Sequence, residues 1–132
     1  PELMAAADVL VTKAGPATIC EACIAGLPIV LSGAIPGQED GNVTHVVDNG
    51  AGVFAPSPEK VAAILQTWLS EGAEALAERS ERARALGRPN AAFDIAEELH
   101  HQAQLPPVRT RFNKSGSDSP QLRPTPEDGW LL

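Results

Sequence analysis

Two short apolar runs, residues 9–12 and 28–31, flank a segment with the pattern of a helix, and this arrangement constrains the fold most. Continuous apolar runs of this length indicate strands that are buried on both faces. Pro16 favours a helix start after Gly15, because proline at the first helical position loses only an N–H that is unpaired anyway. Gly26 favours the end of that helix. A strand, a helix and a second strand in this order predict a parallel βαβ unit.

The same alternation continues to about residue 103. We expect a polar loop over 32–41, a helix over 42–49, a short strand at 53–54 and helices after Ser57, over 74–86 and over 90–102. In the helix after Ser57, apolar residues at helical spacing predict one buried stripe: Val61, Ile64, Leu65, Trp68 and Leu69. The sequence therefore predicts an α/β domain with a partial, Rossmann-like parallel sheet.

The composition changes near residue 104. Residues 104–132 hold 5 of the 12 prolines together with several serines and glycines. Such a segment buries too little apolar surface to offset the entropy lost on ordering. We therefore expect one domain over 1–103 and a disordered tail over 104–132.

Charge and hydropathy exclude several classes of partner. The net charge is −7 and the sequence pI is about 4.8, so the surface repels phosphate backbones and we expect no nucleic-acid partner. No apolar run reaches the roughly 18 residues of a membrane-spanning helix, and no targeting pattern opens the chain. The chain starts at Pro1 without an initiator Met, which suggests a fragment of a longer protein.

The two cysteines, Cys20 and Cys23, have a spacing that is also found in redox and zinc sites. No second pair accompanies them, and both fall within the first expected helix. We interpret them as small buried residues and expect no metal site.

The residues between the first strand and its helix carry the chemistry. Ligands of open α/β sheets bind at the carboxyl ends of strands. The N–H groups of Ala17 and Thr18 at the start of the helix suit a phosphate, which Gly15 allows to approach and Lys13 attracts. One turn later, Glu21 can accept hydrogen bonds from ribose hydroxyls.

A second loop leaves the next strand on the same side of the sheet. Residues 37–42 offer amide and carboxylate groups suited to sugar hydroxyls. We assign no catalytic residue. The candidate donor-binding residues are Lys13, Gly15, Pro16, Ala17, Thr18, Glu21, Gln38, Glu39 and Asn42.

Residues 7–52 closely resemble monogalactosyldiacylglycerol synthases. The resemblance rests on Ala-Asp-Val-Leu-Val-Thr-Lys-Ala-Gly-Pro at 7–16, Gly-Leu-Pro-Ile-Val-Leu at 26–31 and Gly-Gln-Glu with Gly-Asn-Val within 37–43. These enzymes are GT-B glycosyltransferases that transfer galactose from UDP-galactose to diacylglycerol. The resemblance implies that residues 15–18 hold the diphosphate, Glu21 the ribose, and Gln38 with Glu39 the galactose. Ala17 departs from the family, in which glycine is usual, and Thr44-His45 replaces a proline-aromatic pair.

The resemblance further implies a truncated C-terminal domain of a GT-B enzyme with UDP-galactose as donor substrate and no cofactor. Its acceptor, diacylglycerol, would bind through an amino-terminal domain that this chain lacks, so we expect no turnover by the chain alone. The location implied is peripheral, on the chloroplast envelope membrane. Three alternatives stay open: a non-catalytic nucleotide-sugar-binding subunit acting with a membrane partner, a fragment of a lipid-linked N-acetylglucosaminyltransferase resembling the peptidoglycan enzyme, and a truncated product without function.

Overall fold

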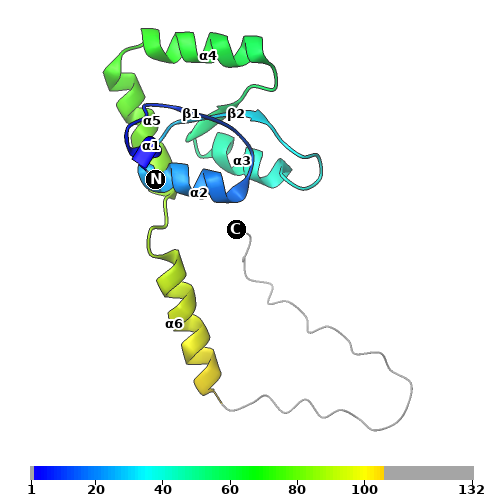
Figure 1. Ribbon diagram of the computed structural model, residues 1–132, viewed down its shortest axis with the longest axis vertical. Coiled ribbons are helices and arrows are strands. Elements are labelled where there is room, and N and C mark those ends of the chain that lie inside the picture. The colour runs from blue at the N-terminus through cyan, green and yellow to red at the C-terminus, as the bar shows by residue number, and fades with distance from the viewer. Residues whose placement is uncertain (1, 106–132) are drawn as a thin grey trace, which may run out of the picture.

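Three short strands form a parallel sheet at the centre of the computed structural model, which describes residues 2–105 (Figure 1). They are β1 (Leu10–Lys13), β2 (Ile29–Gly33) and β3 (Gly52–Phe54), in the order β1-β2-β3. Val30 of β2 lies opposite Val11 of β1 and Val53 of β3. The predicted α/β class and parallel sheet are confirmed.

Helices cover both faces of the sheet. Figure 1 shows α2 (Pro16–Ala25) and α3 (Asp40–Asp48) on one side and α4 (Pro58–Ser70) on the other. The helix α5 (Ala73–Leu86) packs against α2, and the short α1 (Glu2–Ala5) also contacts α2. Because the strands are parallel, the loops that lead from their carboxyl ends into the helices lie at the same edge of the sheet.

The larger core lies between the sheet and the α2, α3 and α5 helices. Its members are apolar or small: Ala14, Ile19, Ala22, Cys23, Leu27, Ile29, Leu31, Val46, Ala51 and Ala83. Each fully buried Ile, Leu or Val stabilises the fold by about 1.5–3 kcal/mol relative to exposure. On the opposite face, Val30 and Trp68 are buried together with Ala55. Because Ile29, Val30 and Leu31 are all inaccessible to solvent, β2 is the doubly buried strand that its apolar run predicts.

The backbone of β3 lies very close to that of β2 at Gly52. A side chain at position 52 would overlap the carbonyl oxygen of Ile29 and crowd Val46. Glycine is therefore required here by close approach of two backbones.

Helix ends follow the residues that predict them. Gly26 ends α2 in the left-handed conformation with φ 72°, and its N–H bonds to carbonyls of the last turn. The hydroxyl of Ser57 accepts a hydrogen bond from the N–H of Lys60 at the start of α4. The helix α3 begins at Asp40, two residues earlier than expected, because Glu39 already occupies the N-cap position.

Two expectations about burial are wrong. Leu69 is 64% exposed whereas Trp68 is 6% exposed, because consecutive helical residues differ by about 100° and Leu69 falls outside the arc of its neighbours. Cys20 is exposed and only Cys23 is buried. Burial raises the pKa of the Cys23 thiol, and the neighbouring Cys20 adds to this effect.

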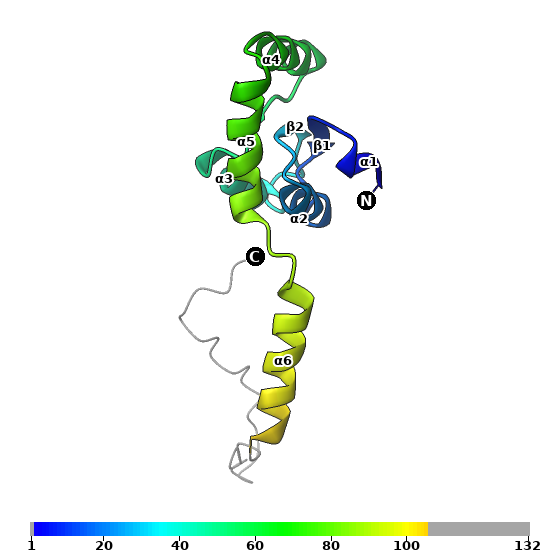
Figure 2. The same ribbon diagram turned by 90° about the vertical axis from the view of Figure 1, so that its left-hand side faces the viewer.

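The last helix, α6 (Ala91–Gln104), extends away from the other elements in both views (Figures 1 and 2). None of its residues is buried. It runs one residue past the boundary expected at 103, and the division into domain and tail stays a prediction, since residues 106–132 lie outside the described part.

Candidate functional site

Two strand ends and two helix starts meet at one edge of the sheet. The end of β1 turns into α2 at Ala14 and Gly15, and β2 leads through residues 34–39 into α3. The N–H of Ala14 donates to the carbonyl of Gly33 at 2.7 Å, which ties the two strand ends together. This is the edge at which open α/β sheets bind ligands.

The first N–H groups of α2 have no side-chain cap. Gly15 is its N-cap, with an extended backbone and no side-chain hydrogen bond to the helix start. It is buried. The first helical bond runs from the N–H of Ile19 to the carbonyl of Gly15 at 3.1 Å. The N–H groups of Ala17 and Thr18 precede that bond and therefore lack an intrahelical acceptor. Pro16 and Ala17 are exposed and Thr18 is half-buried, so an anion can reach these groups from solvent.

Lys13 bends over this turn. A Cβ on Gly15 would lie 3.3 Å from the Lys13 Nζ, so the ammonium stands beside the start of α2. The same Nζ contacts Glu39 Oε1 at 2.6 Å, with the lysine side chain 62% exposed and the glutamate side chain 3% exposed. The Lys13 hydrogen bond, and after it a bond from the N–H of Ile35 to Glu39 Oε2 at 2.9 Å, hold the pKa of the Glu39 carboxyl below its ordinary value.

Asn42 connects the second loop to the first. Its Nδ2 donates to the carbonyl of Ala14 at 2.9 Å. The amide group of Asn42 thus braces the turn before α2. Gln38, by contrast, has an exposed side chain, and so does Glu21 on the second turn of α2.

The structure therefore brings part of the predicted set into direct contact. Lys13 and Glu39 form an ion pair, Lys13 lies over Gly15, and Asn42 bonds to the turn. Glu21 and Gln38 lie on the two elements that flank this group. The bonds of Glu39 and Asn42 with backbone groups could not be read from the sequence, because they depend on how the loop folds back.

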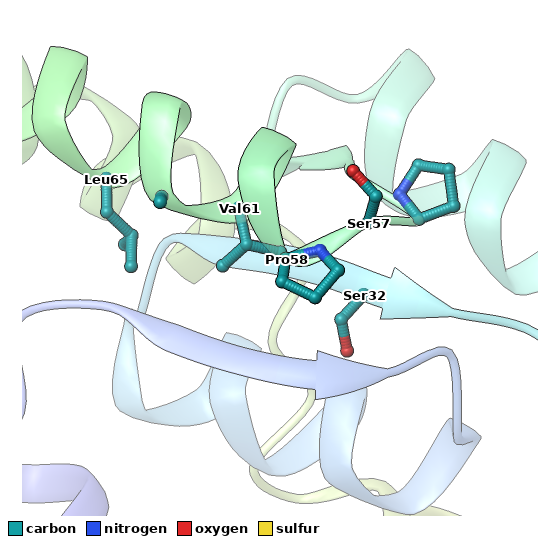
Figure 3. Close-up of a pocket in the computed structure, with 7 residues that line it drawn as sticks. Ser32, Ser57, Pro58, Val61 and Leu65 are labelled. Carbon is teal, nitrogen blue, oxygen red and sulfur yellow. The ribbon is translucent and has the colours of Figure 1, made fainter.

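A pocket of about 350 Å³ lies on the other face, between the end of β2 and the start of α4 (Figure 3). In Figure 3, Val61 and Leu65 point from α4 toward the strands, with Ser32 at the end of β2. None of the predicted donor-binding residues lines it. Its walls come from separate segments and are mostly apolar, so nothing in the sequence pattern signalled a pocket here.

Residues 2–105 contain no group of three or more His, Cys, Asp or Glu residues that could hold a metal ion. None of the helices in this part of the chain is both long and apolar enough to cross a membrane.

Comparison with known proteins bears on the family. The sequence model of the glycosyltransferase family 28 C-terminal domain matches residues 1–99. Monogalactosyldiacylglycerol synthase 3, chloroplastic, of Arabidopsis thaliana is 54% identical over 111 residues, which are 84% of this chain and 24% of that protein. Probable monogalactosyldiacylglycerol synthase 3, chloroplastic, of Oryza sativa subsp. japonica is 44% identical over 124 residues, 94% of this chain and 24% of that protein.

The chain thus spans about a quarter of the length of these relatives. A solved structure, the glycotransferase of kitacinnamycin, overlaps 73% of this chain and 26% of its own with 25% identity and a TM-score of 0.47. The resemblance of residues 7–52 to monogalactosyldiacylglycerol synthases is confirmed by the identities to the plant proteins. The chain belongs to the glycosyltransferase family 28 C-terminal domain family, in the part that it shares with the monogalactosyldiacylglycerol synthases.

Proposed function

We propose that this chain is the donor-binding part of a galactosyltransferase that makes monogalactosyldiacylglycerol, and that its β1–α2 turn binds the diphosphate of UDP-galactose. The observation that carries the proposal is the start of α2, where two N–H groups without acceptors in the helix follow Gly15 and the Lys13 ammonium lies beside that glycine. Similarity to plant enzymes named for this product supports the choice of donor.

The chemistry of glycosyl transfer gives this arrangement a purpose. Negative charge grows on the departing UDP as the bond to the sugar breaks. Fixed dipoles and a nearby ammonium stabilise that charge without having to reorganise, and removing one such donor typically lowers the rate about 10²- to 10³-fold. In this proposal Ala17 and Thr18 donate to the diphosphate, and Lys13 supplies the positive charge.

The flanking residues complete the proposed donor site. The exposed carboxylate of Glu21 accepts hydrogen bonds from the ribose hydroxyls. The exposed amide of Gln38 is free to contact the galactose, since it can both donate and accept hydrogen bonds. No cofactor is required by these contacts.

The acceptor and the location rest on similarity alone. The relatives are named as chloroplastic proteins, and the proposal places this chain at the chloroplast envelope as part of a peripheral membrane enzyme. Diacylglycerol would bind to a portion of the enzyme outside these 132 residues. Turnover by the isolated chain is accordingly not expected.

Binding of UDP to the chain tests the proposal, by calorimetry or by amide shifts around Gly15. Glu21→Ala should weaken UDP about 10-fold or more, since hydrogen bonds to a charged group contribute roughly 1.5–3 kcal/mol, and should leave inorganic pyrophosphate binding unchanged. Glu81→Ala, which removes an exposed carboxylate from α5, is the matched control.

The donor site, the ribose contact and the choice of donor sugar can each be contradicted by a separate result. Absence of UDP binding to the unmodified chain would refute the donor site, and an unchanged UDP affinity in Glu21→Ala would refute the ribose contact. Tighter binding of UDP-N-acetylglucosamine than of UDP-galactose would favour the N-acetylglucosaminyltransferase alternative.

A further inference from the structure

Glu39 is the only charged residue that is buried among residues 2–105. A carboxylate loses its hydration on burial and persists there only when it is paired and hydrogen-bonded. The ion pair spans 26 positions of sequence and joins the loop after β2 to the end of β1. An acid in this place therefore has partners inside the protein that a sugar-binding residue would not need.

Both carboxylate oxygens of Glu39 are engaged. Oε1 contacts the Lys13 ammonium, and Oε2 accepts the N–H of Ile35 within the loop. The backbone of Glu39 also accepts hydrogen bonds from Asn42 and Val43 at the start of α3. The side chain is thus directed at β1 and at its own loop, while its neighbour Gln38 is exposed.

The ammonium that Glu39 holds stands at the proposed diphosphate site. Lys13 is more than half exposed, so its four-carbon stem would sample many rotamers without a partner. An ammonium has three N–H donors, and contact with a single carboxylate oxygen leaves others free. A lysine fixed in this way loses less conformational freedom when a phosphate binds.

We propose that Glu39 is a positioning residue that presents the Lys13 ammonium to the donor diphosphate, and that it makes no contact with the sugar. The inference rests on the proposed function and assigns this carboxylate a role different from galactose recognition. Its lowered pKa agrees with a permanently charged partner for Lys13 at neutral pH.

A double-mutant cycle on the complete 132-residue chain tests this role, with UDP as the probe. Glu39→Gln should weaken UDP binding about three- to tenfold when Lys13 is present. In the Lys13→Met background the same change should alter UDP binding less than twofold, because a residue that acts through Lys13 has nothing left to act on. Equal effects in both backgrounds, or tighter UDP binding by Glu39→Gln alone, would overturn the proposal.

Further variants separate position from charge. Asp40→Asn removes one negative charge at the next position, from a side chain that bonds only to the loop N–H of Gly37, and should change UDP affinity less than twofold. Glu39→Asp keeps the negative charge but has a shorter side chain that does not reach Lys13 in the same way. It should therefore weaken UDP binding as much as Glu39→Gln does. Full affinity in Glu39→Asp would show that charge alone suffices and would contradict positioning.

Two controls remain, one for a contact between Glu39 and the sugar and one for a variant that fails to fold. The ratio of UDP-galactose to UDP affinity should be the same in Glu39→Gln and in the unmodified chain, whereas a fall in that ratio would restore the sugar contact. If Glu39→Gln does not fold, the proposal is tested by the UDP affinity of Glu39→Asp and by the ¹⁵N signal of the Lys13 ammonium in the unmodified chain. That signal must shift when UDP is added to the unmodified chain, and its constancy would overturn the proposal. Failure of UDP to bind at all would instead refute the proposed function.

Discussion

At the scale of single residues, the Lys13–Glu39 ion pair joins the end of β1 to the loop after β2. The sequence indicates Lys13, Gly15 and Glu39 as candidate donor-binding residues, but it does not predict the ion pair between Lys13 and Glu39. Lys13 and Glu39 are far apart in sequence, and their contact depends on the loop after β2 folding back onto β1. Residue types indicate what a site can do, whereas the direction of each side chain depends on tertiary packing.

The ion pair predicts a dependence of stability on pH. Because the pKa of Glu39 is lowered by Lys13 and by Ile35, the folded state binds its proton less readily than the unfolded state. The stabilisation is complete above the ordinary glutamate pKa of 4.5 and is lost as pH falls through that value and through the lowered pKa of the folded state.

Thermal unfolding of Glu39→Gln measures this contribution. The variant should melt below the unmodified chain at pH 7, and the gap between the two midpoints should narrow steadily below about pH 4.5. Glu81→Gln controls for the loss of one negative charge. A gap that is constant from pH 7 to pH 3 would contradict the assignment of the ion pair as a stabilising contact.

At the scale of elements, the periodicity of apolar residues predicted which segments are strands and helices better than it predicted their bounds. The doubly buried β2, the glycine-terminated α2 and the serine-capped α4 all follow from local pattern. The start of α3 was missed because a buried glutamate occupies its N-cap position, and glutamate is not among the usual capping residues. The pocket beside α4 was missed because apolar walls look like ordinary core.

Trp68 and Leu69 give a paired test of the α4 face. Trp68 is buried against the sheet, and the Arg79 guanidinium of α5 lies 5.0 Å from its ring centroid. Trp68→Ala should lower the free energy of unfolding by about 3–5 kcal/mol, because it removes both burial and this contact. Leu69→Ala should cost under about 0.5 kcal/mol. Chemical denaturation measures both, and similar losses would mean that α4 is rotated from the described orientation.

At the scale of the whole molecule, the described residues divide into a packed α/β body and a last helix, α6, that has no buried residue. The sequence predicts a helix over 90–102 that begins at Asn90, but it does not show that Phe93 is 75% exposed. The spacing of apolar residues can indicate that a helix has an apolar face, but it does not show whether another element packs against that face. The prediction of a single domain ending near residue 103 is therefore not decided by pattern alone.

Hydrogen exchange should report this division directly. The amides of α6 should exchange through local opening, with protection far below that of α2, because none of its side chains is buried. Exchange of the α2 amides should require global unfolding of the domain. Comparable protection in the two helices, measured by NMR on the same sample, would show that α6 is held by contacts that the described structure lacks.

The side chain of Asn42 donates a hydrogen bond to the carbonyl of Ala14. It links the first turn of α3 to the bend that precedes α2, so a movement of α3 would also disturb the start of α2. In the proposed donor site, a change of hexose specificity would accordingly require new side chains on the loop between β2 and α3, at positions such as Gln38, and not a shift of its main chain.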